Sequence, residues 1–208
     1  MSSSTLIRKE CSSVKQESRQ MTDEQLLLSY RSTGDQSHFT ELEQRYRQPL
    51  LCFLRRQIGS ESIAEDVLQA TLMQLHVKCG QFEEGRKVRP WLYRIAMNQA
   101  IDSKRRNRRH EIVSLNQSTS SMDGQSYELV EMIRGENLLP EETLQVKEQR
   151  KSVRQAVNSL PQSLQTIVSL VFFQGLKYRE AAETLSIPVG TLKSRMHSAL
   201  LKLRSEWP

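Results

Sequence analysis

Polar side chains that can bind nucleic acid gather near the end of the chain, at Lys193, Ser194, Arg195 and His197. Lysine and arginine donate hydrogen bonds to guanine or phosphate, and serine and histidine can donate or accept. The apolar residues among them recur at three- and four-residue steps: Leu192, Met196, Ala199, Leu200 and Leu203. This spacing predicts a helix that buries the apolar stripe and turns the polar residues outward.

A second short helix is predicted immediately before this one. Ala181, Ala182 and Leu185 share one side of it, and Ile187-Pro188 ends it because proline lacks a backbone donor and disfavours helix in its predecessor. Two short helices, a tight turn and a basic N-terminal half on the second helix form the helix-turn-helix pattern, which places its second helix in the major groove. An amphipathic hairpin with a solvated basic face is the alternative.

A second candidate surface combines aromatic and basic residues. Trp91 and Tyr93 open a predicted helix that continues into a dense basic run, namely Lys104, Arg105, Arg106, Arg108 and Arg109. This pairing is expected where a protein follows a phosphate backbone and offers rings to unstacked bases. An indole on an apolar helix face is more commonly part of a core, whereas so many like charges repel one another unless an anion neutralises them.

The remaining periodic segments predict further helices and require no strand. Thr22 and Gln25 resemble a capping box that opens a helix ended by Gly34-Asp35, and Pro49 marks a kink or boundary in the next. A helix over residues 62–77 carries four outward polar residues: Glu65, Asp66, Gln69 and Gln74. An apolar helix over residues 165–173 ends at Gly175, so the fold class is all-α.

Composition shifts divide the chain into two small helical domains joined by a flexible linker. Residues 1–20 are rich in Ser, Gln and Lys and are expected to form a flexible extension. The first domain is expected over residues 21–109, the polar linker over residues 110–139, and the second domain over residues 140–208.

The charge of the chain restricts its partners. A net charge of +6 and a pI near 9.4 favour a polyanion such as nucleic acid, although charge alone does not separate nucleic acid from a membrane. No apolar run is long enough to span a bilayer, and the N-terminus lacks the apolar core of a signal peptide, so we expect a cytoplasmic protein. The three cysteines fit neither a disulfide framework nor a zinc site, and no cofactor is expected.

Three segments, taken in order, carry a family resemblance: AEDVLQATLMQLH, RPWLYRIAMNQAIDSKRRNRR and LPQSLQTIVSLVFFQGLKYREAAETLSIPVGTLKSRMHSALLKL. Together they strongly resemble the extracytoplasmic-function (ECF) group of bacterial RNA polymerase sigma factors. The resemblance implies two all-helical domains, called regions 2 and 4, joined by a linker. It also implies that core RNA polymerase and promoter DNA are the partners, that an anti-sigma factor is a further possible partner, and that the protein assists promoter melting.

The resemblance assigns roles to particular residues of the first domain. Asp66 and Gln69 match the positions that grip a coiled coil of the polymerase, and Ala70 replaces the usual acid beside them. The loop before Pro90 and the helix through Asn98 match the part that captures an unpaired base of the minus-10 element. The basic side chains near the backbone phosphates are then Arg94, Lys104, Arg105 and Arg106.

In the second domain, the resemblance implies that Lys193, Ser194 and His197 face the minus-35 bases, with Arg195 beside them. Gly190 and Thr191 would present backbone groups to phosphate at the helix N-terminus. Ser198 and Leu200 stand where family members often carry arginine, so fewer phosphate contacts are expected on that flank.

Two other classes of protein are alternatives. A free-standing DNA-binding regulator would leave the basic aromatic helix without a role, and it would bind duplex DNA without polymerase. An enzyme finds no support, because the chain has no phosphate-binding glycine loop or nucleophile-elbow motif, and its histidines have no evident catalytic partners.

Overall fold

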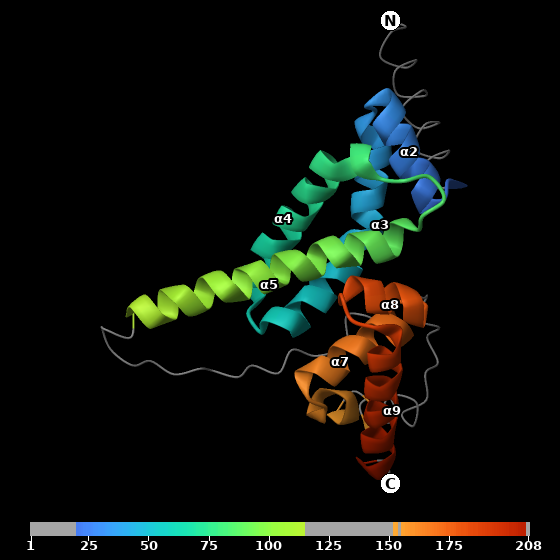
Figure 1. Cartoon of the computed structure of the whole chain (residues 1–208). Helices are drawn as coiled ribbons and strands as arrows, with labels where there is room; N and C mark the ends of the chain where they lie inside the picture. Colours follow the sequence, from blue (N-terminus) through green and yellow to red (C-terminus); the bar gives the residue numbers. More distant parts are fainter. Residues whose placement is uncertain (1–19, 115–151, 154, 207–208) are drawn as a thin grey trace, which may run out of the picture.

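The structure is a computed structural model of the whole chain, and it describes residues 20–114, 152–153 and 155–206. In these ranges every regular element is a helix, which confirms the all-α prediction. Almost all of the extension expected at residues 1–20 and most of the expected linker lie outside the described residues. The helices form two regions, which lie one above the other in Figure 1.

The first region is built around a central helix. It contains α2 (Asp23–Thr33), α3 (Gln36–Ile58), α4 (Glu61–Lys78), the short η1 (Cys79–Gln81) and α5 (Val88–Ser114). Helix α3 contacts α2, α4 and α5, so its apolar side chains occupy the centre of the region. The buried residues of α3 include Leu42, Tyr46, Leu50, Phe53 and Leu54.

Local caps explain where the first helices begin and end. The Thr22 hydroxyl accepts from the Gln25 N–H at 3.2 Å and the Gln25 side chain accepts from the Thr22 N–H at 2.8 Å, which confirms the capping box. Pro49 was expected to mark a kink or a boundary; the boundary is wrong, because Pro49 lies inside one continuous helix, and the kink stays a prediction. Tyr46 and Leu50 are buried on either side of it, and this packing offsets the backbone bond that proline cannot donate.

Helix α5 is longer than the sequence predicts. It begins at Val88 because the Glu24 carboxylate of α2 accepts a hydrogen bond from the Val88 N–H at 3.2 Å, and Val88 itself is fully buried. It ends at Ser114, so residues 110–114 are helical although they were expected in the linker. Its C-terminal half extends beyond the other helices of the region (Figure 1).

The second region contains α7 (Gln162–Val168), η3 (Ser169–Phe173), α8 (Tyr178–Thr184) and α9 (Val189–Glu206). The predicted apolar helix over residues 165–173 is α7 followed by η3, which is a turn of π-helix. Gly175 ends it as predicted, with a φ of 65° that lets the Leu176 N–H reach the Leu170 carbonyl at 3.0 Å.

The turn between α8 and α9 depends on a residue that the sequence pattern did not single out. Ser186 has a φ of 53°, in the left-handed region, and this reversal brings the Ile187 N–H to the Ala182 carbonyl at 3.0 Å. The Pro188 carbonyl then accepts the first hydrogen bond of α9, from the Leu192 N–H at 3.1 Å. The predicted break at Ile187-Pro188 is therefore confirmed.

The apolar stripe of α9 is narrower than predicted. Leu192, Met196 and Ala199 are buried and Leu203 is half-buried, whereas Leu200 is 45% exposed. At 100° per residue, Leu200 lies about 80° from Leu192 around the helix, at the edge of the face that α7 and α8 cover. The prediction that Leu200 belongs to the buried stripe was wrong.

Because Ser186 is exposed and left-handed, its replacement tests the turn without removing a packed side chain. We expect Ser186→Val to lower the free energy of unfolding by about 1–2 kcal/mol relative to Ser186→Gly, since a branched side chain resists this conformation and glycine does not. Urea denaturation followed by circular dichroism measures the difference. Equal stability of the two variants would show that the turn does not depend on this residue.

Candidate functional site

The outward face of α4 combines polar and apolar side chains. Asp66 and Gln69 are both exposed, as predicted. Met73 and Val77 follow them at helical spacing, and each is 64% exposed. Ala70 lies in the middle of the same face and is half-buried. The face therefore offers a carboxylate, an amide and two large apolar side chains to a partner.

Sequence reasoning missed the two apolar members of this face. Met73 and Val77 stand among buried leucines, and an apolar residue in an amphipathic helix is easily assigned to the core. Met73 and Val77 follow Gln69 in steps of four residues and lie seven and eleven residues after Asp66, and this helical spacing was the signal that could have found them.

The middle of α5 presents a second face. Arg94 is half-buried and Asn98 is exposed one turn later, and Arg105 follows on the same side of the helix. Ile101 lies between them and is 43% exposed. Lys104 and Arg106 are also exposed, but at 100° per residue they point to the two flanks of this face. The basic side chains therefore surround one strip about 18 Å long.

The aromatic residues at the start of α5 do not offer their rings to a ligand in this structure. Tyr93 is fully buried, its ring lies edge-on to Phe53 at 5.2 Å, and its hydroxyl donates to the side chain of Gln174. Burial raises the pKa of the Tyr93 hydroxyl, so it stays a neutral donor. Trp91 is half-buried and packs on Phe82 at 5.2 Å. The expectation of rings offered to unstacked bases is therefore wrong for Tyr93 here.

The third face is on α9. Gly190, Lys193, Ser194 and His197 are exposed and lie within about 100° of one another around the helix. The Ser194 hydroxyl donates to the Thr191 carbonyl at 3.0 Å, which leaves its oxygen able to accept a hydrogen bond. 

Two further predicted residues of α9 lie on the other side of the helix. Arg195 is exposed, Thr191 is half-buried, and both lie about 160–200° from Lys193. A DNA base that meets this face of α9 can therefore be contacted by Lys193, Ser194 and His197. Arg195 points away from that face.

In the described part of the chain, no group of three or more His, Cys, Asp or Glu side chains is arranged to hold a metal ion. None of the helices in those residues is both long and apolar enough to cross a bilayer.

Comparison with known proteins identifies the family. The chain matches Sigma-70 region 2 over residues 42–110 and Sigma-70, region 4 over residues 150–203. It is 30% identical over 173 residues to the ECF RNA polymerase sigma factor SigW of Bacillus subtilis, a match that covers 83% of this chain and 90% of SigW. This chain belongs to the ECF sigma factors.

Other sigma factors support this assignment. The chain is 30% identical over 186 residues to the ECF RNA polymerase sigma-E factor of Escherichia coli, which covers 88% of this chain and 92% of that protein. The fold of this chain is similar to that of the sigma factor RpoE of Bartonella quintana, which was solved in complex with the anti-sigma factor NepR. That match has a TM-score of 0.56 and 24% sequence identity, and it covers 80% of this chain and 96% of RpoE.

The burial of Tyr93 separates a structural role from a DNA-binding role. We expect Tyr93→Ala to lower the free energy of unfolding by about 3–5 kcal/mol, because it removes a buried ring from the contact between α3 and α5. Thermal and urea unfolding measure this loss. A variant of unchanged stability that binds promoter DNA less well would instead assign Tyr93 to the DNA surface.

Proposed function

We propose that this sigma factor binds core RNA polymerase, directs it to promoters through the minus-35 and minus-10 elements, and assists melting. The observation that carries the proposal is the exposure of three separate faces, on α4, α5 and α9, in a chain of the ECF family. We assign region 2 to residues 21–109, region 4 to residues 140–208, and the linker to the residues between them.

The α4 face is the proposed polymerase contact. Asp66 and Gln69 supply a charge and a hydrogen-bonding amide at its N-terminal end. Met73 and Val77 continue the face with apolar surface, which gains free energy when a partner covers it. Ala70 leaves this face without the acid usual in the family, and the two apolar side chains supply contact area in its place.

The α5 face is the proposed minus-10 contact. Asn98 can donate and accept hydrogen bonds at a base edge, and the surrounding cations attract the phosphate backbone. The cations are Arg94, Lys104, Arg105 and Arg106. Melting requires no bond chemistry: the free energy of unstacking a base is offset by the contacts that the flipped base makes.

The N-terminal half of α9 is the proposed minus-35 reader. Lys193 can donate to guanine acceptors, Ser194 can accept from a base amine, and His197 can do either. Lysine lacks the fork of arginine, so discrimination at its base pair is modest. Arg195 on the flank, with the backbone N–H groups at Gly190 and Thr191, would contact phosphate.

The same proposal places the protein in the cytoplasm, where its polymerase and promoters are, and gives it no enzymatic activity of its own. An anti-sigma factor is a further candidate partner, because the Bartonella quintana sigma factor of similar fold was solved with one.

Transcription by core polymerase tests the function as a whole. We expect core enzyme alone to be inactive on a library of duplex promoter fragments, and core enzyme with this chain to produce transcripts from a subset that share minus-35 and minus-10 sequences. Transcription that is independent of the added chain would overturn the proposal.

The polymerase face can be tested with a matched pair of charge reversals on α4. We expect Asp66→Lys to weaken binding to core polymerase at least about tenfold, and Met73→Ala to weaken it by roughly 1–2 kcal/mol. Glu65→Lys is the control, because it makes the same charge change about 100° around the same helix. Fluorescence titration of core enzyme measures all three, and an equal effect of Asp66→Lys and Glu65→Lys would remove Asp66 from the contact.

Substitutions on the exposed face of α9 should reduce the preference of the complex for its cognate minus-35 sequence. Lys193→Ala or His197→Ala should cost about 1–3 kcal/mol in binding a cognate minus-35 element, within the complex with core polymerase. Lys202→Ala is the control, because Lys202 is exposed on the opposite side of α9. Competition between cognate and altered minus-35 duplexes measures the preference. If Lys202→Ala and Lys193→Ala reduced binding of the cognate duplex equally, α9 would contribute only its positive charge and not sequence recognition.

A further inference from the structure

Helix α2 fastens the segment that joins α4 to α5, and we call residues 82–87 of this segment the connecting loop. Arg31, in the last turn of α2, donates from Nη1 to the Phe82 carbonyl at 2.9 Å and from Nη2 to Glu84 Oε1 at 2.9 Å. Phe82 follows the end of η1, so its carbonyl belongs to no helix. A charged donor makes a strong hydrogen bond to such a carbonyl, and Arg31 therefore fixes the start of the loop.

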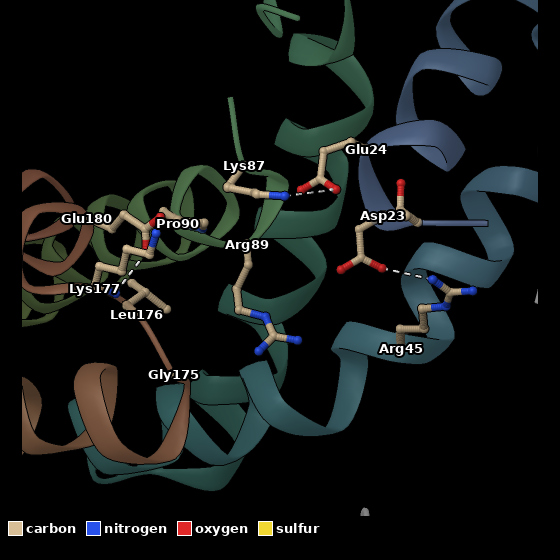
Figure 2. Close-up of a pocket in the computed structure, with 11 residues that line it drawn as sticks. Asp23, Glu24, Arg45, Lys87, Arg89, Pro90, Gly175, Leu176, Lys177 and Glu180 are labelled. Atoms are coloured by element: carbon tan, nitrogen blue, oxygen red, sulfur yellow. Dashed lines mark hydrogen bonds and ion pairs between the residues drawn. The ribbon is translucent and has the colours of Figure 1, made fainter. Parts of the chain in front are cut away.

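The same face of α2 holds the end of the connecting loop. The Glu24 carboxylate accepts a hydrogen bond from the Val88 N–H at 3.2 Å, and its Oε2 lies 3.7 Å from Lys87 Nζ (Figure 2). Glu24 and Arg31 are seven residues apart, which places them on one face of α2, about 10 Å apart along its axis. The loop is therefore attached at both ends to one helix.

The interior of the connecting loop is a tight turn. The Arg86 N–H donates to the Glu83 carbonyl at 3.2 Å, and Gly85 has a φ of 87°, which glycine adopts without strain. Phe82 is buried, and its ring packs at 5.2 Å on Trp91 near the start of α5. The conformation of the loop is thus determined by the contacts at its ends and by the turn between them.

The acidic side chains of the connecting loop are each paired with an arginine. Glu83 contacts Arg86 at 2.7 Å, and Glu84 contacts Arg31. Both carboxylates are largely exposed, at 66% and 72%, and exposed ion pairs contribute little to stability. Unpaired carboxylates would, however, repel a phosphate backbone that passes the basic face of α5. The pairing therefore matters more for the charge that the loop presents than for the stability of the fold.

The connecting loop lies in the segment before Pro90, which the family resemblance assigns to capture of an unpaired minus-10 base. A loop that must become ordered during capture loses part of the free energy of its contacts with the base. We propose that Arg31 and Glu24 are positioning residues, which hold the connecting loop in the conformation that receives this base. The attachment of the loop rests on the contacts alone, whereas its effect on base capture rests on the proposed function.

Amide hydrogen exchange in the free full-length chain tests the attachment itself. We expect Glu24→Ala to speed exchange of the Val88 N–H about tenfold, because this N–H loses its acceptor. Glu24→Gln should leave the rate within about twofold, since the glutamine carbonyl can still accept the hydrogen bond. Arg31→Ala should speed exchange over residues 82–87. Unchanged exchange in both alanine variants, measured by NMR, would show that α2 does not hold the loop.

Base capture is measured in the complete complex with core polymerase. The probe is a promoter duplex recovered in the transcription assay, with 2-aminopurine at each minus-10 position in turn, whose fluorescence rises when the base unstacks. We expect Arg31→Ala to slow this rise about tenfold, and to leave the affinity for core polymerase and the unfolding transition unchanged. Arg47→Ala is the control, because it removes an exposed arginine whose ion pair with Glu43 lies within α3.

A double variant separates positioning from neutralisation of charge. If Arg31 acted only by neutralising Glu84, adding Glu84→Gln to Arg31→Ala would restore the rate of base capture. We expect no restoration, because the Phe82 carbonyl still lacks its donor. Glu24→Ala should also slow capture, whereas Glu24→Gln should not, in parallel with the exchange of the Val88 N–H.

Other results would decide against the positioning role. Equal rates of capture in Arg31→Ala and Arg47→Ala would show that the attachment of the loop has no part in base capture. A parallel loss of stability and of affinity for core polymerase in Arg31→Ala would make Arg31 a structural residue of the first region. If the unaltered chain directs no transcription, the proposed function fails and the role in base capture fails with it, while hydrogen exchange still decides whether α2 holds the loop.

Discussion

The packing of α3 against α2, α4 and α5 is the constraint on which the functional surfaces depend. Leu50, Phe53 and Leu54 are fully buried in it, and a helix packed on such a core can turn only its opposite face to solvent. The burial of Phe53 against Tyr93 thus fixes which residues of α5 face outward. Helix α4 also packs on α3, and this leaves Asp66 and Met73 exposed on the same outward face of α4. The end of α3 also supplies Gln57, which bonds to Thr166 of α7. One helix therefore positions both the exposed faces of α4 and α5 and part of the contact between the two regions.

Local periodicity predicted most of the helices, because α4 and α9 each bury one stripe at three- and four-residue steps. The sequence could not place the features that depend on distant partners. Val88 begins α5 because it meets Glu24 from α2, and Tyr93 is buried because Phe53 and Gln174 cover it. Leu200 was misassigned because periodicity gives the centre of a buried stripe more accurately than its width.

Of the candidate site, the residue types and their outward direction could be predicted, since exposure follows from the buried stripe. Lys193, His197 and Asn98 are exposed as expected. The difference between Lys193 and Arg195, which point to opposite sides of α9, follows from helical geometry and needed no structure. The contact between the two regions could not be predicted. Nothing in the sequence pattern distinguishes Thr166 and Gln174 from exposed polar residues, and their partners lie in the other region.

We assign promoter recognition to the complex with core polymerase rather than to the free chain, and one titration tests this most directly. Binding of purified protein to core RNA polymerase is measured first, and then retention of selected promoter duplexes with and without core enzyme. We expect tight binding to core polymerase and specific DNA retention only in the complex. Specific duplex binding by the free protein, with no affinity for core polymerase, would contradict it and favour a free-standing regulator.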